Sequence, residues 1–250
     1  MCWGKGYICT TIMKWSKCKH IVCMLVVMLM VSSCGDQYNI LGTSSVDVYE
    51  GSTVYLKIES RAGLCAYDSA EVSHGKFGFE GNMDTICMAH LFVGDHSLLP
   101  LVLETGNISI SFTDADRNVR GGTLNNKLYR FLSENSRLQN EIQMASRNTA
   151  KLILAGAAPE SYADMEKRGE ILQDKLDRLW VSFIVNNSDN VLGPVYFQEY
   201  TSQYFYPVIT PQIERILKRA SQSFLCNPSV QMYIRDARYN MMLIQGNFPR

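Results

Sequence analysis

Cysteine is the residue type in this 250-residue sequence with the widest chemistry, because a thiolate can act as nucleophile, metal ligand and disulfide partner. Five of the eight cysteines lie within the first 34 residues. The other three are Cys65, Cys87 and Cys226, an odd number that allows one disulfide at most. Cys65 and Cys87 are close in sequence and both lie in strand-like surroundings, so they are a candidate disulfide. The alternative is that all three are small buried hydrophobic residues.

The other arrangements of reactive side chains give little evidence for a catalytic or metal site. No Cys-x-x-Cys pair follows residue 34, so that part of the chain lacks the usual dithiol redox site. Cys87, His90 and His96 have a spacing that fits no zinc pattern. The aspartate, serine and histidine between residues 68 and 74 lack the nucleophile elbow of a hydrolase triad. We therefore predict no catalytic residues, no metal site and no cofactor.

The N-terminal segment has the order of a secretory signal peptide: lysines, an apolar run over residues 21–31, then Ser32 and Ser33. The run of 11 apolar residues is too short to span a bilayer, which takes about 20. Translation could start at Met1 or at Met13, because residues 13–33 alone make a complete signal.

Val31-Ser32-Ser33-Cys34 resembles the lipobox of bacterial lipoproteins. In that family the cysteine thiol receives diacylglycerol, the chain is cut before the cysteine, and the new N-terminus is acylated. The resemblance implies lipidation of Cys34, removal of residues 1–33 and contact with a membrane through the N-terminal lipid. It also implies a place in the cell envelope, on the outer or the inner membrane, facing the periplasm or the cell surface. A buried hydrophobic segment or a signal cut elsewhere is the alternative.

Composition indicates which class of protein the chain from Cys34 onward belongs to. The 46% of apolar residues are enough to build a core. Four of the 24 basic residues and none of the 24 acidic ones precede Cys34, which leaves a net charge of −4 for the rest. A basic excess is typical of nucleic-acid binding, so we predict no nucleic-acid partner.

Two kinds of periodicity divide the chain. Short strand patterns separated by turns occupy about residues 40–120, and from Thr123 apolar residues recur with a helical period. The predicted strands include Thr53–Ile58, a strand carrying Phe77 and Phe79 on one face, Cys87–Val93, Leu98–Glu104 and Ile108–Phe112. The last two are predicted to form a hairpin around residues 105–107. Thr210-Pro211 and Asn227-Pro228 each supply an N-cap and a first-turn proline for a helix.

The predicted fold class is α+β. After the signal peptide (1–33) we expect a β-rich module (34–122), an antiparallel β-sandwich or open barrel, and then an α-helical region (123–250).

Three segments of the β-rich part resemble the signatures of one family. Asp68–Phe79 has a serine-bearing strand leading into Gly-x-Phe-x-Phe, and Leu99–Ile108 and Val119–Leu128 follow in the same order as in the family. Together they are similar to the module of unknown function found ahead of the thioredoxin-like domain in lipoproteins of the TlpA/AhpC-TSA thiol–disulfide interchange type. The module brings no catalytic residues.

The helical part extends the resemblance. Phe183–Gly193 resembles the linker of those lipoproteins, and Ile244–Arg250 resembles the lead-in to their redox domain. The sequence stops there, without the Trp-Cys-x-x-Cys site. Either a shorter form works alone, or the gene is truncated or split and another chain carries the redox domain.

An aromatic-rich segment over residues 196–206 offers a candidate ligand surface. Tyr196 and Tyr204 could stack on a sugar ring, and the alternative is a helix core with hydroxyls at its rim.

Three hypotheses follow. The first is a lipid-anchored, non-catalytic envelope protein whose β-module binds or positions a partner such as an envelope redox protein, and whose helices brace it or form a homodimer. The second is a thiol–disulfide oxidoreductase split from its redox domain. The third is a carbohydrate-binding surface lipoprotein.

Overall fold

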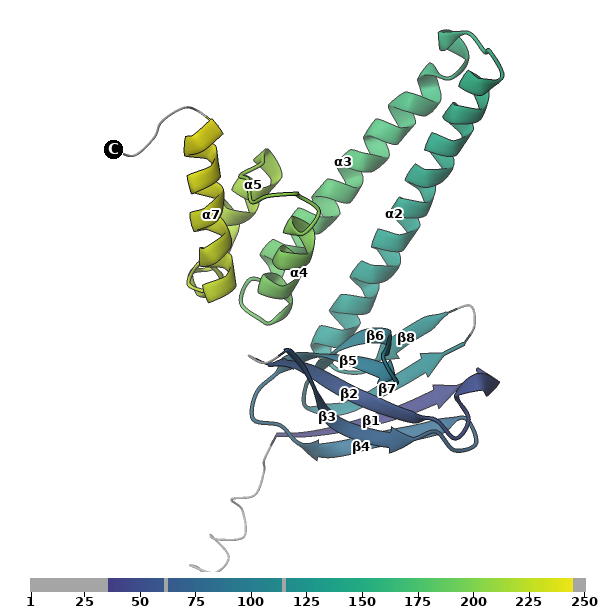
Figure 1. The fold of residues 1–250 in the computed structure, drawn as a ribbon, viewed down its shortest axis with the longest axis vertical. Helices are drawn as coiled ribbons and strands as arrows, with labels where there is room; N and C mark the ends of the chain where they lie inside the picture. Colours follow the sequence, from purple (N-terminus) through teal and green to yellow (C-terminus); the bar gives the residue numbers. More distant parts are fainter. Residues whose placement is uncertain (1–35, 61–62, 114–115, 245–250) are drawn as a thin grey trace, which may run out of the picture.

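The computed structural model describes residues 36–60, 63–113 and 116–244. This part of the chain is α+β: two four-stranded sheets come first and helices follow, as predicted (Figure 1). The strands are β1 (Gln37–Ser44), β2 (Thr53–Ser60), β3 (Gly63–Glu71), β4 (Lys76–Asn82), β5 (Cys87–Val93), β6 (His96–Leu103), β7 (Gly106–Phe112) and β8 (Arg117–Arg120). The helices are α2 (Thr123–Leu154), α3 (Ala163–Asn186), α4 (Leu192–Thr201), α5 (Pro211–Arg219), α6 (Gln222–Leu225) and α7 (Pro228–Ile244), with short 3-10 helices η1 (Asp47–Tyr49) and η2 (Pro159–Ser161).

The β-module is a sandwich of two sheets with strand orders β4-β1-β7-β8 and β3-β2-β5-β6. Alternation along the strands sends one set of side chains into the core between the sheets. Val54 and Leu56 of β2 are fully buried there, and Phe77 and Phe79 of β4 are buried on the facing sheet. The β-sandwich is therefore the form adopted, rather than the open barrel.

The predicted hairpin of β6 and β7 is wrong. β6 pairs with β5, whereas β7 belongs to the other sheet, where it pairs with β8 and, in parallel, with β1. The chain crosses from one sheet to the other between Leu103 and Gly106. The reason lies in β6, which is covered on both faces: Leu101 faces the sandwich core and Val102 faces the helices. A strand covered on both faces is apolar throughout and does not reveal which neighbour it pairs with.

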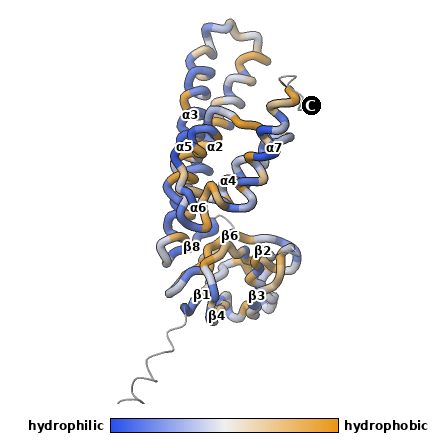
Figure 2. Tube along the Cα trace, turned by 90° about the vertical axis from the view of Figure 1, so that its left-hand side faces the viewer, coloured by the Kyte–Doolittle hydropathy of each residue, from blue (hydrophilic) through white to orange (hydrophobic). Residues whose placement is uncertain are grey.

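The helical region has its own core, continuous with the outer face of the β3-β2-β5-β6 sheet. Phe197 and Phe224 are fully buried in it, and Figure 2 shows hydrophilic residues along much of α2 and α3. Both predicted helix starts are confirmed. The Thr210 hydroxyl accepts a bond from the backbone N–H of Ile213, and Asn227 Oδ1 accepts one from Ser229 N–H. Within the described ranges, no helix combines the length and the apolar character needed to cross a membrane.

The outer edge of β6 is occupied by side chains. β6 ends its sheet and pairs with β5 on one side only. Three side chains donate to alternate carbonyl oxygens along its other side: Arg117 to Leu98 at 2.7 Å, Tyr129 to Pro100 at 2.8 Å and Asn125 to Val102 at 2.7 Å. β8 and α2 thus hold β6 without adding a strand.

Candidate functional site

The structure separates the two cysteines of the predicted disulfide, and Cys34 lies outside the described residues. β2 runs between β3, which carries Cys65, and β5, which carries Cys87. Ile58 of β2 pairs with Cys65 on one side and with Ala89 on the other, so the two cysteines are two strands apart. Neighbouring strands lie about 4.8 Å apart, and a disulfide needs Cα atoms within about 7 Å. This corrects the predicted Cys65–Cys87 pairing, and Cys87 carries a free thiol.

The predicted stacking tyrosines belong to the helical core or its edge. Tyr196 is 7% exposed, and its ring lies 5.4 Å from that of Phe131 and 5.2 Å from that of Phe183. Burial raises the pKa of its hydroxyl. Tyr204 is partly buried and packs edge-on against Tyr200, with ring centroids 6.4 Å apart. This corrects the predicted role of Tyr196, because stacking on a sugar needs an open ring face. The role of Tyr204 stays a prediction, because its ring is partly exposed.

Asp68 and His74, which were considered for a triad, have other hydrogen-bond partners, and the metal candidates Cys87, His90 and His96 belong to no metal-holding group of the described residues. Within residues 36–60, 63–113 and 116–244, no three His, Cys, Asp or Glu side chains are grouped to hold a metal ion. Asp68 accepts bonds from Ser69 N–H at 2.7 Å and from the Tyr38 hydroxyl at 3.2 Å. The His74 ring contacts the hydroxyl of Ser73 at 3.1 Å.

A buried polar pair, Glu104 and Asn125, fixes the start of α2 to the β-module; we call it the joint. Glu104 accepts bonds from the backbone N–H groups of Leu124 at 3.1 Å and Asn125 at 2.8 Å. These N–H groups have no partner within the helix, and the N-cap residue, Gly122, has no side chain to offer them. The Asn125 amide also donates to Glu104 at 3.0 Å and bonds both the N–H (2.8 Å) and the carbonyl (2.7 Å) of Val102. The joint therefore sets the direction in which α2 leaves the sandwich.

Glycine at position 122 is required by the joint. Its φ is +75°, and a Cβ there would overlap the carboxylate of Glu104. The sequence motifs Leu99–Ile108 and Val119–Leu128 thus meet in space, with Glu104 in one and Gly122 and Asn125 in the other.

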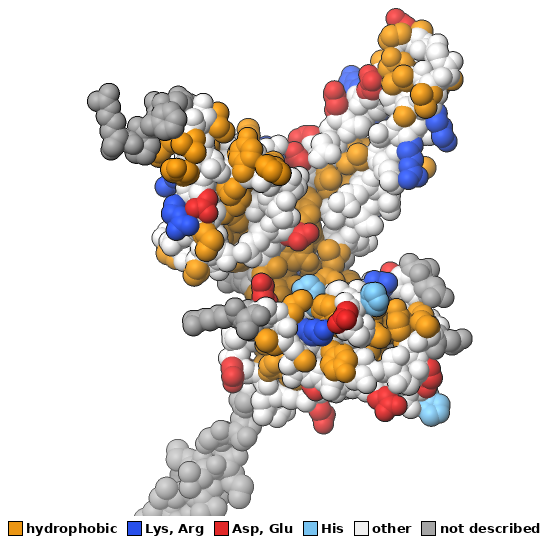
Figure 3. All heavy atoms as spheres, viewed as in Figure 1, with side chains coloured by type: hydrophobic (Ala, Val, Ile, Leu, Met, Phe, Trp, Pro, Cys, Tyr) orange, Lys and Arg blue, Asp and Glu red, His pale blue; other side chains and the backbone are white. Residues whose placement is uncertain are grey.

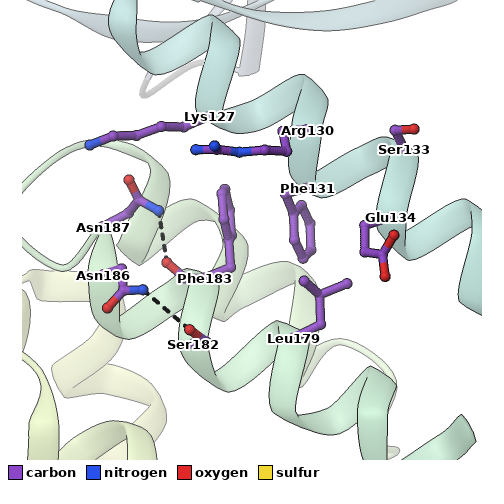
Figure 4. A pocket seen from close by; sticks show the side chains of 10 residues that line it. All are labelled: Lys127, Arg130, Phe131, Ser133, Glu134, Leu179, Ser182, Phe183, Asn186 and Asn187. Carbon is purple, nitrogen blue, oxygen red and sulfur yellow. Dashed lines mark hydrogen bonds between the residues drawn. The ribbon is translucent and has the colours of Figure 1, made fainter.

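Directly beyond the joint, a cleft of about 720 Å³ opens between α2 and α3 (Figure 4). Its lining is Lys127, Arg130, Phe131, Ser133 and Glu134 from α2, and Leu179, Ser182, Phe183, Asn186 and Asn187 from α3 and the residue after it. Figure 3 shows hydrophobic side chains along the pair of helices α2 and α3, down to where the pair meets the β-module. The volume is within the range typical of small-molecule sites.

Aromatic rings form a fixed floor for the cleft. Phe131 and Phe183 stack with their centroids 4.0 Å apart and 12° between their planes. Trp180 packs edge-on behind Phe131, at 4.9 Å, and its indole N–H donates to Asn135 at 2.9 Å. The two phenylalanines are 3% and 8% exposed, so only a small part of each side chain reaches the cleft.

Positive charge and polar groups gather at one end. Lys127 and Arg130 extend over the cleft toward Asn187 (Figure 4). Neither forms an ion pair or a side-chain hydrogen bond within the part of the chain that the structure describes. Asn187 is buried and donates to a backbone carbonyl one turn earlier at 2.8 Å. The Asn186 amide donates to the hydroxyl of Ser182 at 3.2 Å, which leaves the hydroxyl hydrogen of Ser182 for another acceptor.

The acidic residue of the lining already has a cationic partner. Glu134 accepts two bonds from Arg137, at 2.9 and 2.6 Å, and these bonds lower the pKa of its carboxyl. Arg137 also bonds Glu141. Arg130 extends away from Glu134 in Figure 4, so the positive end of the cleft keeps its charge.

No sequence motif indicated this cleft. Lys127 and Arg130 are three residues apart, on one face of the expected helix, which was the available signal. The partner helix that closes the cleft begins 36 positions after Lys127 and carries no motif that assigns it there.

No curated protein matches the chain. One family model matches residues 38–129, which run from β1 to Tyr129 of α2. This range contains both residues of the joint and all eight strands, apart from Gln37 at the start of β1. Residues 38–129 are therefore similar to the family described as Domain of unknown function (DUF4369).

Proposed function

We propose that this protein is a lipid-anchored binding protein of the cell envelope, without catalytic activity of its own. The cleft between α2 and α3 is the observation that carries the binding role, because it joins an aromatic floor to two positive side chains. The lipid anchor rests on Val31–Cys34, which follows a basic segment and an apolar run. In this proposal the lipid holds the chain at a membrane, and the β-module supports the cleft.

A relation to the thiol–disulfide interchange lipoproteins of the TlpA/AhpC-TSA type is part of the proposal. It is supported by the three β-module motifs, two of which contribute residues to the joint. An envelope redox protein is then the expected protein partner, positioned by the β-module.

A split oxidoreductase is the second candidate, favoured by the likeness of Phe183–Gly193 to the linker ahead of a redox domain. In a turbidity assay with dithiothreitol, the purified protein is expected to reduce the insulin disulfides no faster than dithiothreitol alone does. Reduction above the uncatalysed rate contradicts the non-catalytic role, and an open reading frame with Trp-Cys-x-x-Cys just downstream of the gene favours the split enzyme.

Mass spectrometry of the native protein tests the anchor. We expect the chain to begin at Cys34 with diacylglycerol on its thiol and an acyl chain on its amine. Cys34→Ser should leave the precursor uncut and unacylated, whereas Cys65→Ser should be processed normally. An unmodified Cys34 with the preceding residues retained would overturn the anchored location.

Filling the cleft tests the binding role. Ser182→Trp places a large ring in the cleft, and Ser146→Trp places the same ring on an exposed position of α2 outside it. In a thermal-shift survey of small acidic, basic and neutral compounds, we expect some to stabilise wild type and Ser146→Trp but not Ser182→Trp. A survey in which every stabilising compound acts equally on all three proteins contradicts binding in the cleft.

A further inference from the structure

The two ends of the cleft differ in chemistry, and the difference indicates the ligand. Lys127 and Arg130 stand over one end, and Phe131 and Phe183 with Leu179 line the floor (Figure 4). We propose that the cleft binds a small amphiphilic acid, with one carboxylate or phosphate-type group joined to a compact apolar body. This inference rests on the proposed binding function and names its ligand class.

The acidic group would lie between Lys127 and Arg130. Both side chains lack an acidic partner among the described residues and extend over the same end of the cleft. Arginine presents a planar fork that suits carboxylate and phosphate oxygens, and lysine adds a compact charge. The hydroxyl hydrogen of Ser182 is available as a third donor, because its oxygen already accepts from Asn186.

The apolar body would lie on the aromatic floor. The stacked rings of Phe131 and Phe183 are held from behind by Trp180, so the floor is formed before the ligand arrives. Apolar contacts on a preformed surface avoid the cost of ordering side chains on binding. The volume of about 720 Å³ is of the size that accommodates a small molecule.

Glu134 does not oppose an acidic ligand. Both of its oxygens accept bonds from Arg137, and these bonds hold its charge away from the end where Lys127 and Arg130 lie.

Binding of 3-phenylpropionate to the native protein tests the ligand class. Three relatives separate its parts: 3-phenylpropionamide has the body without the charge, acetate has the charge without the body, and phenyl phosphate replaces carboxylate by phosphate. Calorimetry measures affinity. Trp180 fluorescence reports the location, because its ring contacts Phe131 and the other two tryptophans precede Cys34.

We expect the acid to bind at least about tenfold more tightly than the amide or acetate, because charged hydrogen bonds and apolar contacts act together. The comparison with phenyl phosphate tells which acidic group is preferred. The double variant Lys127→Gln/Arg130→Gln should lose about tenfold in affinity for the acid and none for the amide. The control variant is Arg147→Gln/Lys151→Gln, which removes the same number of positive charges from exposed positions of α2 outside the cleft. It should bind the acid with the affinity of wild type.

Equal affinity for acid and amide, or an unchanged affinity in Lys127→Gln/Arg130→Gln, overturns the ligand class. In that case the two cations would stabilise the carbonyl groups at the C-terminus of α3 instead of binding a ligand. The Lys127→Gln/Arg130→Gln variant would then have a lower melting temperature and an unaltered affinity. If neither phenyl acid binds while other compounds stabilise wild type but not Ser182→Trp, this inference fails and the proposed binding function stands.

Discussion

Two neighbouring stretches of α2 use polar side chains in opposite ways. In the joint, Asn125 is fully buried, and its amide bonds Glu104 and both backbone groups of Val102. One turn further on, Lys127 and Arg130 extend over a cleft with no acidic partner among the described residues. Polar groups that satisfy one another build the fold, whereas polar groups left open at a preformed surface are free to bind a ligand. The contrast predicts that substitutions in the joint lower stability and substitutions in the cleft alter binding.

The largest effect is expected for Asn125→Ala. It leaves the N–H and carbonyl groups of Val102 without partners in a buried place and removes a bond to Glu104. We expect the free energy of unfolding to fall by about 3 kcal/mol. Chemical denaturation measures it, with Asn126→Ala as the matched control, because Asn126 is exposed and accepts one bond from Gly121. Equal losses in the two variants would remove the distinction between joint and surface.

Glu104→Gln should cost less. The substitution keeps the shape of the side chain, but one of its two oxygens becomes an NH2 group that faces a backbone N–H of α2. The helix start also loses a negative charge that it favours. We expect a loss of about 2 kcal/mol in the free energy of unfolding, measured as above. A stability equal to that of wild type would mean that the charge contributes nothing to the joint.

Lys127→Gln/Arg130→Gln should change the free energy of unfolding by no more than about 0.5 kcal/mol, because these side chains form no ion pair with a described residue. The measurement is the denaturation midpoint without ligand. A loss as large as that of Glu104→Gln would show that the cations are part of the scaffold, and the comparison between the two stretches would break down.

The smallest effect is expected for Arg137→Gln. Arg137 holds the pKa of Glu134 below 4.5, so the pair stabilises the folded protein above about that pH, and the contribution is lost as the pH falls through the lowered pKa. The melting temperature of the variant should be slightly lower than that of wild type at pH 7 and equal to it well below pH 4.5. NMR titration should show the Glu134 pKa rising toward 4.5 in the variant. A difference that grows on acidification contradicts this sign.

Local patterns were enough to predict several of the elements, but not the long-range pairing of the strands. Strand patterns located β2, β4 and β5, and the pairs Thr210-Pro211 and Asn227-Pro228 located two helix starts, because these features depend on neighbouring residues. Which strand pairs with which depends on residues far apart. The hairpin of β6 and β7 was therefore mispredicted, and the separation of Cys65 from Cys87 by β2 was not foreseen.

The site was harder to predict than the fold. Tyr196 looks the same in sequence whether its ring is open or packed against Phe131 and Phe183, and only tertiary packing decides. The joint connects Glu104 with Asn125, which lies 21 residues later in the sequence. The cleft is lined by both Lys127 and Ser182, which are more than 50 residues apart. Neither pairing leaves a periodic signal in one sequence.

The side chains along the outer edge of β6 also have a consequence for how molecules of this protein meet. An exposed edge strand is a template on which a second chain can add its own strand, and this is a route to aggregation. The outward carbonyls of Leu98, Pro100 and Val102 are already taken, and Pro100 has no N–H to offer. The same contacts that attach α2 and β8 to β6 therefore prevent a second chain from adding a strand at this edge of the sandwich.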